Sequence, residues 1–237
     1  MCIIIVANVN KKISNRIIKQ AYKNNPDGFG IAASINGKLE VIKGLYKPSK
    51  IIKIYNQLRA KASGDIVLHF RLATHGNVTD SLCHPFRVND DLVMFHNGII
   101  DKQLVGWTKD CTSESDSSLF CKNILQKFKY GFECDDYILN MLGDFIGFYN
   151  KICLLNSDGK VSYINKDEWI TYRNITYSND SLLPEGYTGL FDYDEEYEEY
   201  KNNIDYYKDY EDVTMGDDYD YVNYGRMDEY YDDRIFN

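Results

Sequence analysis

The strongest constraint on the fold comes from two places where an apolar run stops, turns tightly and resumes. Residues 28–35 (GFGIAASI) are joined by Asn36-Gly37 to residues 38–44 (KLEVIKG). Asn-Gly is the preferred two-residue turn of a β-hairpin. Residues 145–156 and 160–165 flank the turn Ser-Asp-Gly in the same way. Because a hairpin pairs neighbouring strands antiparallel, both segments predict mainly antiparallel sheets.

Apolar periodicity predicts the remaining elements. Runs rich in β-branched and aromatic residues indicate strands at 2–8, 65–72, 91–97 and 169–178. Helical spacing of apolar residues indicates helices at 13–24, 48–63 and 113–128. The chain has enough strands for two sheets, with helices to cover their outer faces. We therefore expect a layered α+β domain over about residues 2–180.

Charge is distributed unevenly along the 237 residues. Residues 185–237 hold 18 Asp and Glu against 4 Lys and Arg, a net of −14, whereas the whole chain has a net charge of −9. The body is therefore mildly basic, at +5, and residues 181–237 form an acidic C-terminal tail. This tail also holds 12 of the 21 tyrosines. Direct binding of nucleic acid is not expected from such a charge balance.

Three interpretations of the tail stay open. Tyr193, Tyr197, Tyr200, Ile204 and Tyr207 are spaced 4, 3, 4 and 3 residues apart, which places them on one face of a helix. In the first interpretation, the tail is an amphipathic helix that docks on the body or on a partner. An acidic, solvated and disordered tail is the plainer interpretation. A surface that mimics DNA is the third.

The spacing of the cysteines and the hydropathy of the chain indicate the cellular compartment of the protein. No stretch approaches the ~20 apolar residues of a membrane span, and the first twelve residues have the reverse order of a secretory signal. The six cysteines show no CxxC pair and no regular framework. Scattered thiols of this kind are typical of reduced proteins, so we expect a cytoplasmic protein without membrane association, in the host cytoplasm if the source is viral.

All four histidines fall in three short polar clusters near predicted strand ends. The clusters are HFRLATHG (69–76), CHPF (83–86) and FHNGII (95–100), and a fourth, SESDSS (113–118), opens a predicted helix. Taken singly, each histidine is more often a structural residue than a ligand. No HxH or HxxxH spacing occurs, so we expect no metal. We find no phosphate-binding or dinucleotide-binding glycine motif and expect no cofactor.

A nucleophile at the chain terminus accounts for more of these residues together. If methionine removal makes Cys2 the first residue, its own α-amino group can act as general base for the thiol. Asn97 and the unhindered backbone N–H of Gly98 offer an oxyanion hole. Arg71 suits a carboxylate, and Asp116 can bind an ammonium group. A substrate with both groups is an α-amino acid.

The ordered set of motifs resembles the glutaminase domain of class II glutamine amidotransferases, which are N-terminal nucleophile hydrolases. The family has H-x-R-x-A-T-H-G, then His-Pro, H-N-G-x-I and S-x-x-D behind an N-terminal cysteine, and all occur here in that order. The likeness is first to the amidotransferase half of glucosamine-6-phosphate synthase and next to amidophosphoribosyltransferase. It covers about residues 2–180 and implies a four-layer α/β/β/α sandwich of two mainly antiparallel sheets.

The resemblance assigns a role to each matching residue. Cys2 would be the nucleophile, Asn97 and Gly98 the oxyanion hole, Arg71 and Asp116 the binders of the glutamine α-carboxylate and α-ammonium, and Thr74 and His75 the lining of the glutamine pocket. Asp27, Gly28, His69, His84 with Pro85, and His96 are expected to be structural. Two positions depart from the family, which has Gly where this chain has Ile3 and an aromatic residue where it has Leu72.

The resemblance implies hydrolysis of glutamine to glutamate and ammonia through a thioester. No synthase domain follows residue 180, so we expect a separate protein to handle the ammonia acceptor. Free glutaminase activity and hydrolysis of a related γ-glutamyl amide are alternatives, as is a binding module that engages a partner through its acidic tail. Stand-alone domains of this kind resemble those of bacteriophages, and the Asn-, Ile-, Lys- and Tyr-rich composition fits an AT-rich genome.

Overall fold

The computed structural model describes residues 1–73, 78–108, 111, 113–184 and 187. The chain divides into two compact units, Met1–Tyr193 and Asp194–Asn237. The second unit and most of the predicted acidic tail lie outside the described residues. In the first unit, none of the described helices is long and apolar enough to cross a membrane.

Ten strands and four α-helices make up the described part of the first unit. In chain order they are β1 (Ile3–Asn8), α1 (Asn15–Asn24), β2 (Phe29–Ile35), β3 (Lys38–Gly44), α2 (Pro48–Arg59), β4 (Asp65–Phe70), β5 (Phe86–Asn89), β6 (Leu92–Asn97), α3 (Asp116–Asn123), α4 (Asp136–Ile146), β7 (Lys151–Asn156), β8 (Val161–Ile164), β9 (Ile170–Tyr172) and β10 (Ile175–Tyr177). Four 3-10 helices join them, at Asp80–Leu82, Leu125–Lys127, Phe132–Cys134 and Lys166–Glu168.

The strands form two sheets whose hydrogen-bonded neighbours are all antiparallel. One sheet has six strands in the order β3-β2-β4-β1-β10-β9, and the other has four in the order β5-β6-β7-β8. The predicted hairpins are present as β2–β3 and β7–β8. In the first, Asn36 and Gly37 adopt positive φ of 52° and 74°, the conformation that this tight turn requires.

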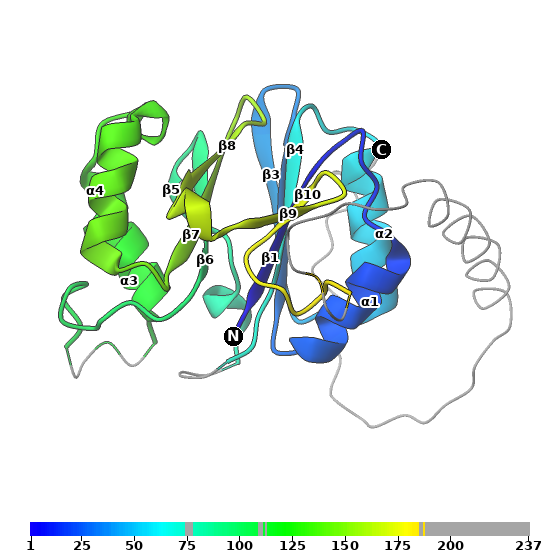
Figure 1. Cartoon of the computed structure of the whole chain (residues 1–237), viewed down its shortest axis with the longest axis horizontal. Coiled ribbons are helices and arrows are strands. Elements are labelled where there is room, and N and C mark those ends of the chain that lie inside the picture. Colours follow the sequence, from blue (N-terminus) through cyan, green and yellow to red (C-terminus); the bar gives the residue numbers. More distant parts are fainter. Residues whose placement is uncertain (74–77, 109–110, 112, 185–186, 188–237) are drawn as a thin grey trace, which may run out of the picture. The chain divides into compact units, whose positions relative to one another are not determined.

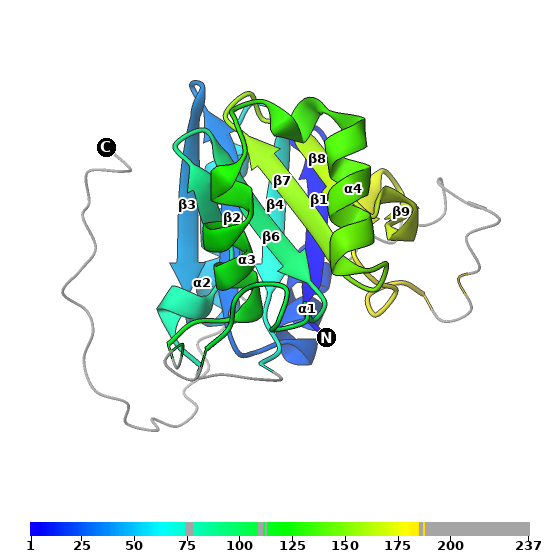
Figure 2. The same cartoon turned by 90° about the vertical axis from the view of Figure 1, so that its left-hand side faces the viewer.

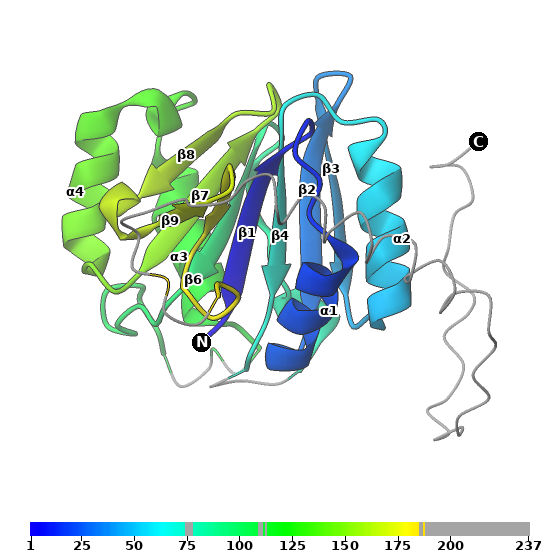
Figure 3. The ribbon, with the colours of Figure 1, turned by 45° about the vertical axis from the view of Figure 1, so that its right-hand side comes forward.

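The two sheets lie face to face with helices outside them (Figure 1). Helices α1 and α2 cover the six-stranded sheet, and α3 and α4 cover the four-stranded one (Figures 2 and 3). Three separate apolar clusters fill the three interfaces between these layers. The predicted four-layer α/β/β/α sandwich is therefore confirmed.

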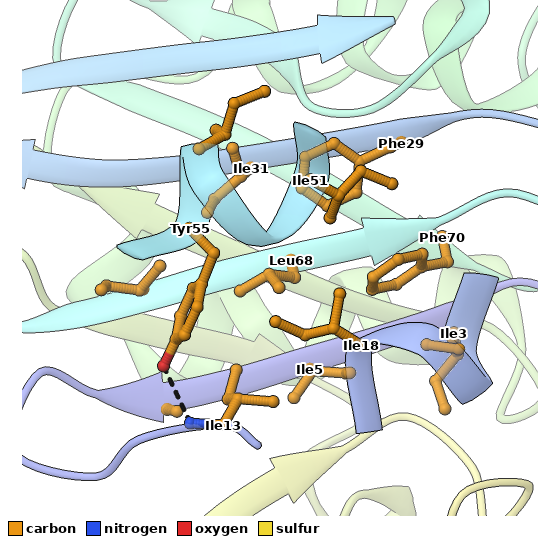
Figure 4. Close-up of a cluster of buried hydrophobic side chains, with 14 of the residues drawn as sticks. Ile3, Ile5, Ile13, Ile18, Phe29, Ile31, Ile51, Tyr55, Leu68 and Phe70 are labelled. Carbon is orange, nitrogen blue, oxygen red and sulfur yellow. Dashed lines mark hydrogen bonds between the residues drawn. The ribbon is translucent and has the colours of Figure 1, made fainter. Parts of the chain in front are cut away.

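Strand β1 contributes to two of these clusters because successive side chains of a strand point to opposite faces. Ile3 and Ile5 belong to the cluster under α1 and α2, while Ile4 and Val6 lie between the sheets. In the outer cluster, the buried Tyr55 hydroxyl accepts a hydrogen bond from the backbone N–H of Ile13 at 2.8 Å (Figure 4). This bond satisfies a buried donor just before α1 begins.

The structure corrects the sequence analysis in three places. The predicted strand at 145–156 begins only at Lys151, because residues up to Ile146 belong to α4, a helix that was not predicted. The predicted strand at 169–178 is a hairpin, in which Arg173 and Asn174 turn with positive φ between β9 and β10. Strand β5 was also not predicted.

Candidate active site

Strand β1 determines where Cys2 points. The register of β1 with β4 pairs Ile3 with Phe70 and Ile4 with His69, so its continuation sets Cys2 opposite Arg71. By the alternation of the strand, Cys2 shares the face of Ile4, which lies between the two sheets. Ile3, the residue that departs from the family, is fully buried in the outer cluster on the opposite face.

Hydrogen bonds hold the first two residues from both sides. Asn25 Nδ2 donates to the Met1 carbonyl at 2.6 Å, and Asn179 Nδ2 donates to the Cys2 carbonyl at 2.9 Å. The Cys2 thiol donates to the Leu72 carbonyl, with a sulfur-to-oxygen distance of 3.7 Å. The second departure from the family, Leu72, therefore contacts the thiol through its backbone, which any side chain at this position would provide.

The pKa of the Cys2 thiol is raised above its ordinary value. Burial is the largest cause, and Asp116 adds to it, whereas the hydrogen bond to Leu72, the chain-terminal amine and Arg71 act in the opposite direction. Burial raises the pKa because it disfavours the charged thiolate. With Met1 in place, the thiol is therefore mostly protonated near neutral pH.

A cavity of about 330 Å³ brings Cys2 together with residues from three distant parts of the chain. Arg71, Gly98 and Asp116 line it beside Cys2. They come from the end of β4, the end of β6 and the first residue of α3. The remaining lining includes Ile99, Lys102 and Trp107 at one side and His84 at another. Four of the seven residues predicted for the site thus line one cavity.

Backbone contacts fix Arg71 at the cavity. Its N–H donates to the Gly28 carbonyl at 2.8 Å, and its carbonyl accepts from the Asp27 N–H at 3.0 Å. The Asp27 carboxylate also accepts from the N–H of Ala73 at 2.8 Å. Arg71 is only 5% exposed, so its guanidinium is a buried cation beside the thiol. Asp27 and Gly28 act on the site through this backbone pairing.

Asn97 is the last residue of strand β6 and Gly98 follows it, and the two residues have different surroundings. Gly98 has a φ of 152°, and a Cβ atom there would collide with Asn150, so both conformation and space require glycine. Asn97 is buried and does not line the cavity; its Nδ2 donates to Ser178 Oγ at 3.0 Å. An amide nitrogen carries two hydrogens, so this bond leaves one donor of Asn97 for another partner.

Asp116 is placed by the start of helix α3. Ser115 caps the helix and forms a capping box with Ser118, and Asp116 is the first helical residue. Its Oδ2 accepts a hydrogen bond from the Ile100 N–H at 2.8 Å. A carboxylate in the first turn of a helix is also stabilised by the helix dipole. The carboxylate is therefore held at the cavity, bonded to Ile100, which follows Gly98 by two residues in the sequence.

Three histidines gather at the cavity as buried, neutral rings, and two of them, His84 and His96, line it. The His69 and His84 rings lie 4.1 Å apart between centroids, and His84 and His96 lie 6.4 Å apart. Burial lowers the pKa of all three, that of His69 to about 3. His96 lies 2.9 Å from Asn150 Oδ1 through Nε2 and 2.7 Å from Ser117 Oγ through Nδ1. Since Asn150 Oδ1 can only accept, the proton of His96 is on Nε2.

Four polar residues of the site were not singled out from the sequence. Ser178 and Asn179 follow β10, and they contact Asn97 and Cys2 from the far end of the domain. Asn25 precedes β2, and Asn150 precedes β7. None of them stands in a motif that distinguishes it from other polar residues near strand ends, and only the pairing of the strands brings them to the site.

Two of the predicted site residues, Thr74 and His75, lie outside the described residues. Among the side chains that are described, no group of three His, Cys, Asp or Glu is arranged to hold a metal ion. The described lining offers a thiol, a buried guanidinium, an ammonium group and the carboxylates of Asp101, Glu114 and Asp116.

No family model matches the chain, but individual known proteins are similar to it. An uncharacterised protein of Methanocaldococcus jannaschii is 29% identical over 172 residues, which cover 67% of this chain and 48% of that protein. The glutamine–fructose-6-phosphate aminotransferase (isomerizing) of Pyrococcus horikoshii is 27% identical over 150 residues, covering 60% of this chain and 25% of the aminotransferase. The chain thus spans about half or less of the length of these relatives.

Among solved structures, the fold is similar to that of glutamine phosphoribosylpyrophosphate amidotransferase from B. subtilis, in its complex with ADP and GMP. The TM-score is 0.50 at 17% sequence identity, and the match covers 77% of this chain and 42% of that one. A likeness at this level of identity shows the fold.

Proposed function

Because the chain has the fold of a class II glutamine amidotransferase and resembles this class in sequence, we propose that it hydrolyses glutamine with Cys2 as the nucleophile. The observation that carries this proposal is the cavity in which Cys2, Arg71, Gly98 and Asp116 meet. These residues are far apart in the chain, and their chemistry is complementary to an α-amino acid that carries a carboxamide.

Removal of Met1 is the first requirement. The thiol has a raised pKa in the chain that retains Met1, because it is buried. Removal of Met1 leaves a free α-amino group on Cys2 itself, which can take the thiol proton as a general base. The bond from Asn179 to the Cys2 carbonyl does not involve Met1, so it continues to hold the new terminus.

Arg71 and Asp116 then hold the substrate by its two charged groups. The guanidinium of Arg71 forms a bidentate pair with the α-carboxylate, and the carboxylate of Asp116 binds the α-ammonium. Both are charge-assisted interactions, and the burial of Arg71 strengthens the first of them. The side chain of glutamine is then directed toward Cys2.

The reaction is an acyl transfer in two steps. The Cys2 sulfur attacks the carboxamide carbon, the α-amine passes the thiol proton to the leaving nitrogen, and ammonia departs as a thioester forms. Water then attacks the thioester, which gives glutamate and restores the thiol. The Gly98 N–H stabilises the oxyanion in both steps, and Asn97 joins it when its second Nδ2 hydrogen turns from behind the cavity wall toward the substrate. Thr74 and His75 contribute to the glutamine pocket.

The ammonia is passed to an acceptor that a separate protein handles. This part of the proposal rests on the likeness to an aminotransferase and to an amidotransferase, names that imply an acceptor for the nitrogen. A pull-down with the full chain would identify the partner protein, and the activity of that partner would identify the acceptor.

A glutaminase assay of the wild type beside Cys2→Ala tests the proposal. We expect the purified protein to begin at Cys2 by intact mass, to release glutamate from glutamine, and to be modified at Cys2 by a glutamine-analogue electrophile. Cys2→Ala should lose both glutamate release and labelling while it keeps the fold. A correctly processed wild type that is neither labelled nor active would refute the proposal.

A further inference from the structure

Helix α4 (Asp136–Ile146) presents a run of large apolar side chains to solvent. We call this run the α4 stripe. It consists of Tyr137, Met141, Phe145, Phe148 and Tyr149, which are 79%, 44%, 40%, 58% and 75% exposed. The first three are spaced four residues apart and therefore share one face of the helix. Phe148 and Tyr149 follow shortly after the end of the helix, and their ring centroids lie 3.8 Å apart.

The opposite face of α4 is already buried. Leu139, Leu142, Gly143 and Ile146 pack on the four-stranded sheet, and α4 forms the outer layer of the unit there (Figures 1 and 2). A helix at the surface of a protein usually has one apolar face, and a helix that is apolar all round is usually buried. Single exposed apolar residues need no explanation, but a contiguous patch marks an interface.

The size of the stripe is adequate for an interface between two chains. Aromatic side chains bury about 200 Å² each, so the exposed fractions of the five residues amount to roughly 600 Å². A standard interface buries about 800 Å² on each partner. With the polar residues at its rim, such as Asn140 and Asp144, the stripe supplies most of one side of such an interface.

We propose that the α4 stripe binds the same stripe of a second copy of this chain, with the two α4 helices antiparallel about a two-fold axis. In this arrangement Tyr137 of each copy packs against Phe148 and Tyr149 of the other. Asp135 and Asp136, at the start of one helix, then approach Lys151, which follows the end of the other helix. Antiparallel helices also place opposite ends of their dipoles side by side.

The acidic tail of the same chain suits this surface less well. Residues 185–237 carry a net charge of −14. The stripe is flanked by its own acids, Asp135, Asp136 and Asp144, which would repel such a segment. Antiparallel pairing of two copies instead brings acids of one chain to a lysine of the other.

Analytical ultracentrifugation of the full chain, from micromolar to millimolar concentration, tests the proposal. We expect the wild type to sediment at twice the chain mass. The double variant Tyr137→Glu/Tyr149→Glu should sediment as a monomer, because four carboxylates would meet in the interface. Both tyrosines are at least 75% exposed, so these changes leave the fold intact, as an unchanged midpoint of urea unfolding would show.

A matched control separates the stripe from general surface effects. Leu45 is 51% exposed and lies between β3 and α2, on the six-stranded sheet's side of the unit. Leu45→Glu should remain a dimer. A wild type that is monomeric throughout the range would overturn the proposal, and so would a double variant that still dimerises. The catalytic cavity contains no residue of α4, so glutaminase activity is expected to be independent of both results.

Discussion

The carboxylate of Asp116 accepts a hydrogen bond from the backbone N–H of Ile100 at 2.8 Å. This bond joins the start of α3 to the segment that directly follows Gly98. The proposed binder of the α-ammonium and the proposed oxyanion donor are therefore parts of one structural unit, and a change in one can displace the other. Separating charge from hydrogen bonding at Asp116 thus requires an isosteric substitution.

Asp116→Asn keeps the acceptor for the Ile100 N–H and removes the charge. We expect kcat/KM for glutamine to fall about 10- to 100-fold, mainly through KM, because a hydrogen bond to a charged group contributes about 1.5–3 kcal/mol. The free energy of unfolding should change little. Asp116→Ala, which also removes the acceptor, should lose stability in addition. Equal kinetics for wild type and Asp116→Asn would show that Asp116 does not bind the ammonium.

Reactivity of Cys2 should depend on whether Met1 is removed. In a chain that carries a tag before Met1, burial raises the pKa of the thiol, so alkylation by iodoacetamide should accelerate only at high pH. In the processed chain the adjacent amine assists loss of the proton, and the rate should rise at lower pH. Alkylation rates measured against pH for the two forms test this. Coincident profiles would contradict a role for the terminal amine.

The parts of the fold that follow from local pattern were predictable from the sequence. Asn36-Gly37 specified the first hairpin, and the continuous apolar run at residues 2–8 specified the strand that positions Cys2. Helix α4 was missed because its outer face carries Tyr137, Met141 and Phe145. Large apolar residues on both faces removed the helical periodicity, and Phe148 and Tyr149 then resembled a strand that continues into Lys151.

Only those site residues that stand in a sequence motif were predictable. Cys2, Arg71, Gly98 and Asp116 stand in recognisable motifs, and the structure brings all four to one cavity. Asn97 lies beside it and bonds to Ser178, a partner 81 residues away that no motif indicates. Contacts of this kind depend on the pairing of β1 with β10, which is a property of the tertiary structure. Thr74 and His75 remain predictions.

Ser178→Ala should weaken both the fold and the site. Ser178 Oγ accepts from the Ile4 N–H at 2.9 Å and from Asn97 Nδ2 at 3.0 Å, and both donors are buried. Each unsatisfied buried donor costs about 1–3 kcal/mol, so the loss of both bonds should lower the free energy of unfolding by about 2–6 kcal/mol. The freed Asn97 should lower kcat more than it changes KM. Urea unfolding and steady-state kinetics on the same preparation would measure both effects.

Gly98→Ala should destabilise the protein more than an alanine at a glycine with free space around it. Both Gly98 and Gly131 have positive φ, 152° and 86°, which costs an alanine about 1–3 kcal/mol. A Cβ atom at Gly131 meets nothing, whereas at Gly98 it collides with Asn150. The difference between the two variants in urea unfolding isolates the collision. If Gly98→Ala is no less stable than Gly131→Ala, β6 and β7 separate more easily than the structure indicates.

The buried histidines predict a loss of stability in mild acid. Burial lowers the pKa of His69 to about 3 and those of His84 and His96 below their ordinary value. The unfolded chain binds protons below pH ~6.5, where the folded chain does not, so stability should fall as the pH drops from 6.5 toward 3. Each histidine contributes at most about 1.4 kcal/mol per pH unit.

His84→Leu tests which groups are responsible. Among the described residues, neither buried ring nitrogen of His84 has a hydrogen-bond partner, so an apolar side chain of similar size removes one titrating group and two unsatisfied atoms. We expect the variant to be at least as stable as the wild type at pH 7 and to lose less stability between pH 6.5 and pH 4.5. The free energy of unfolding in urea across this range measures both. A variant whose acid dependence matches that of the wild type would show that His84 does not contribute to the loss.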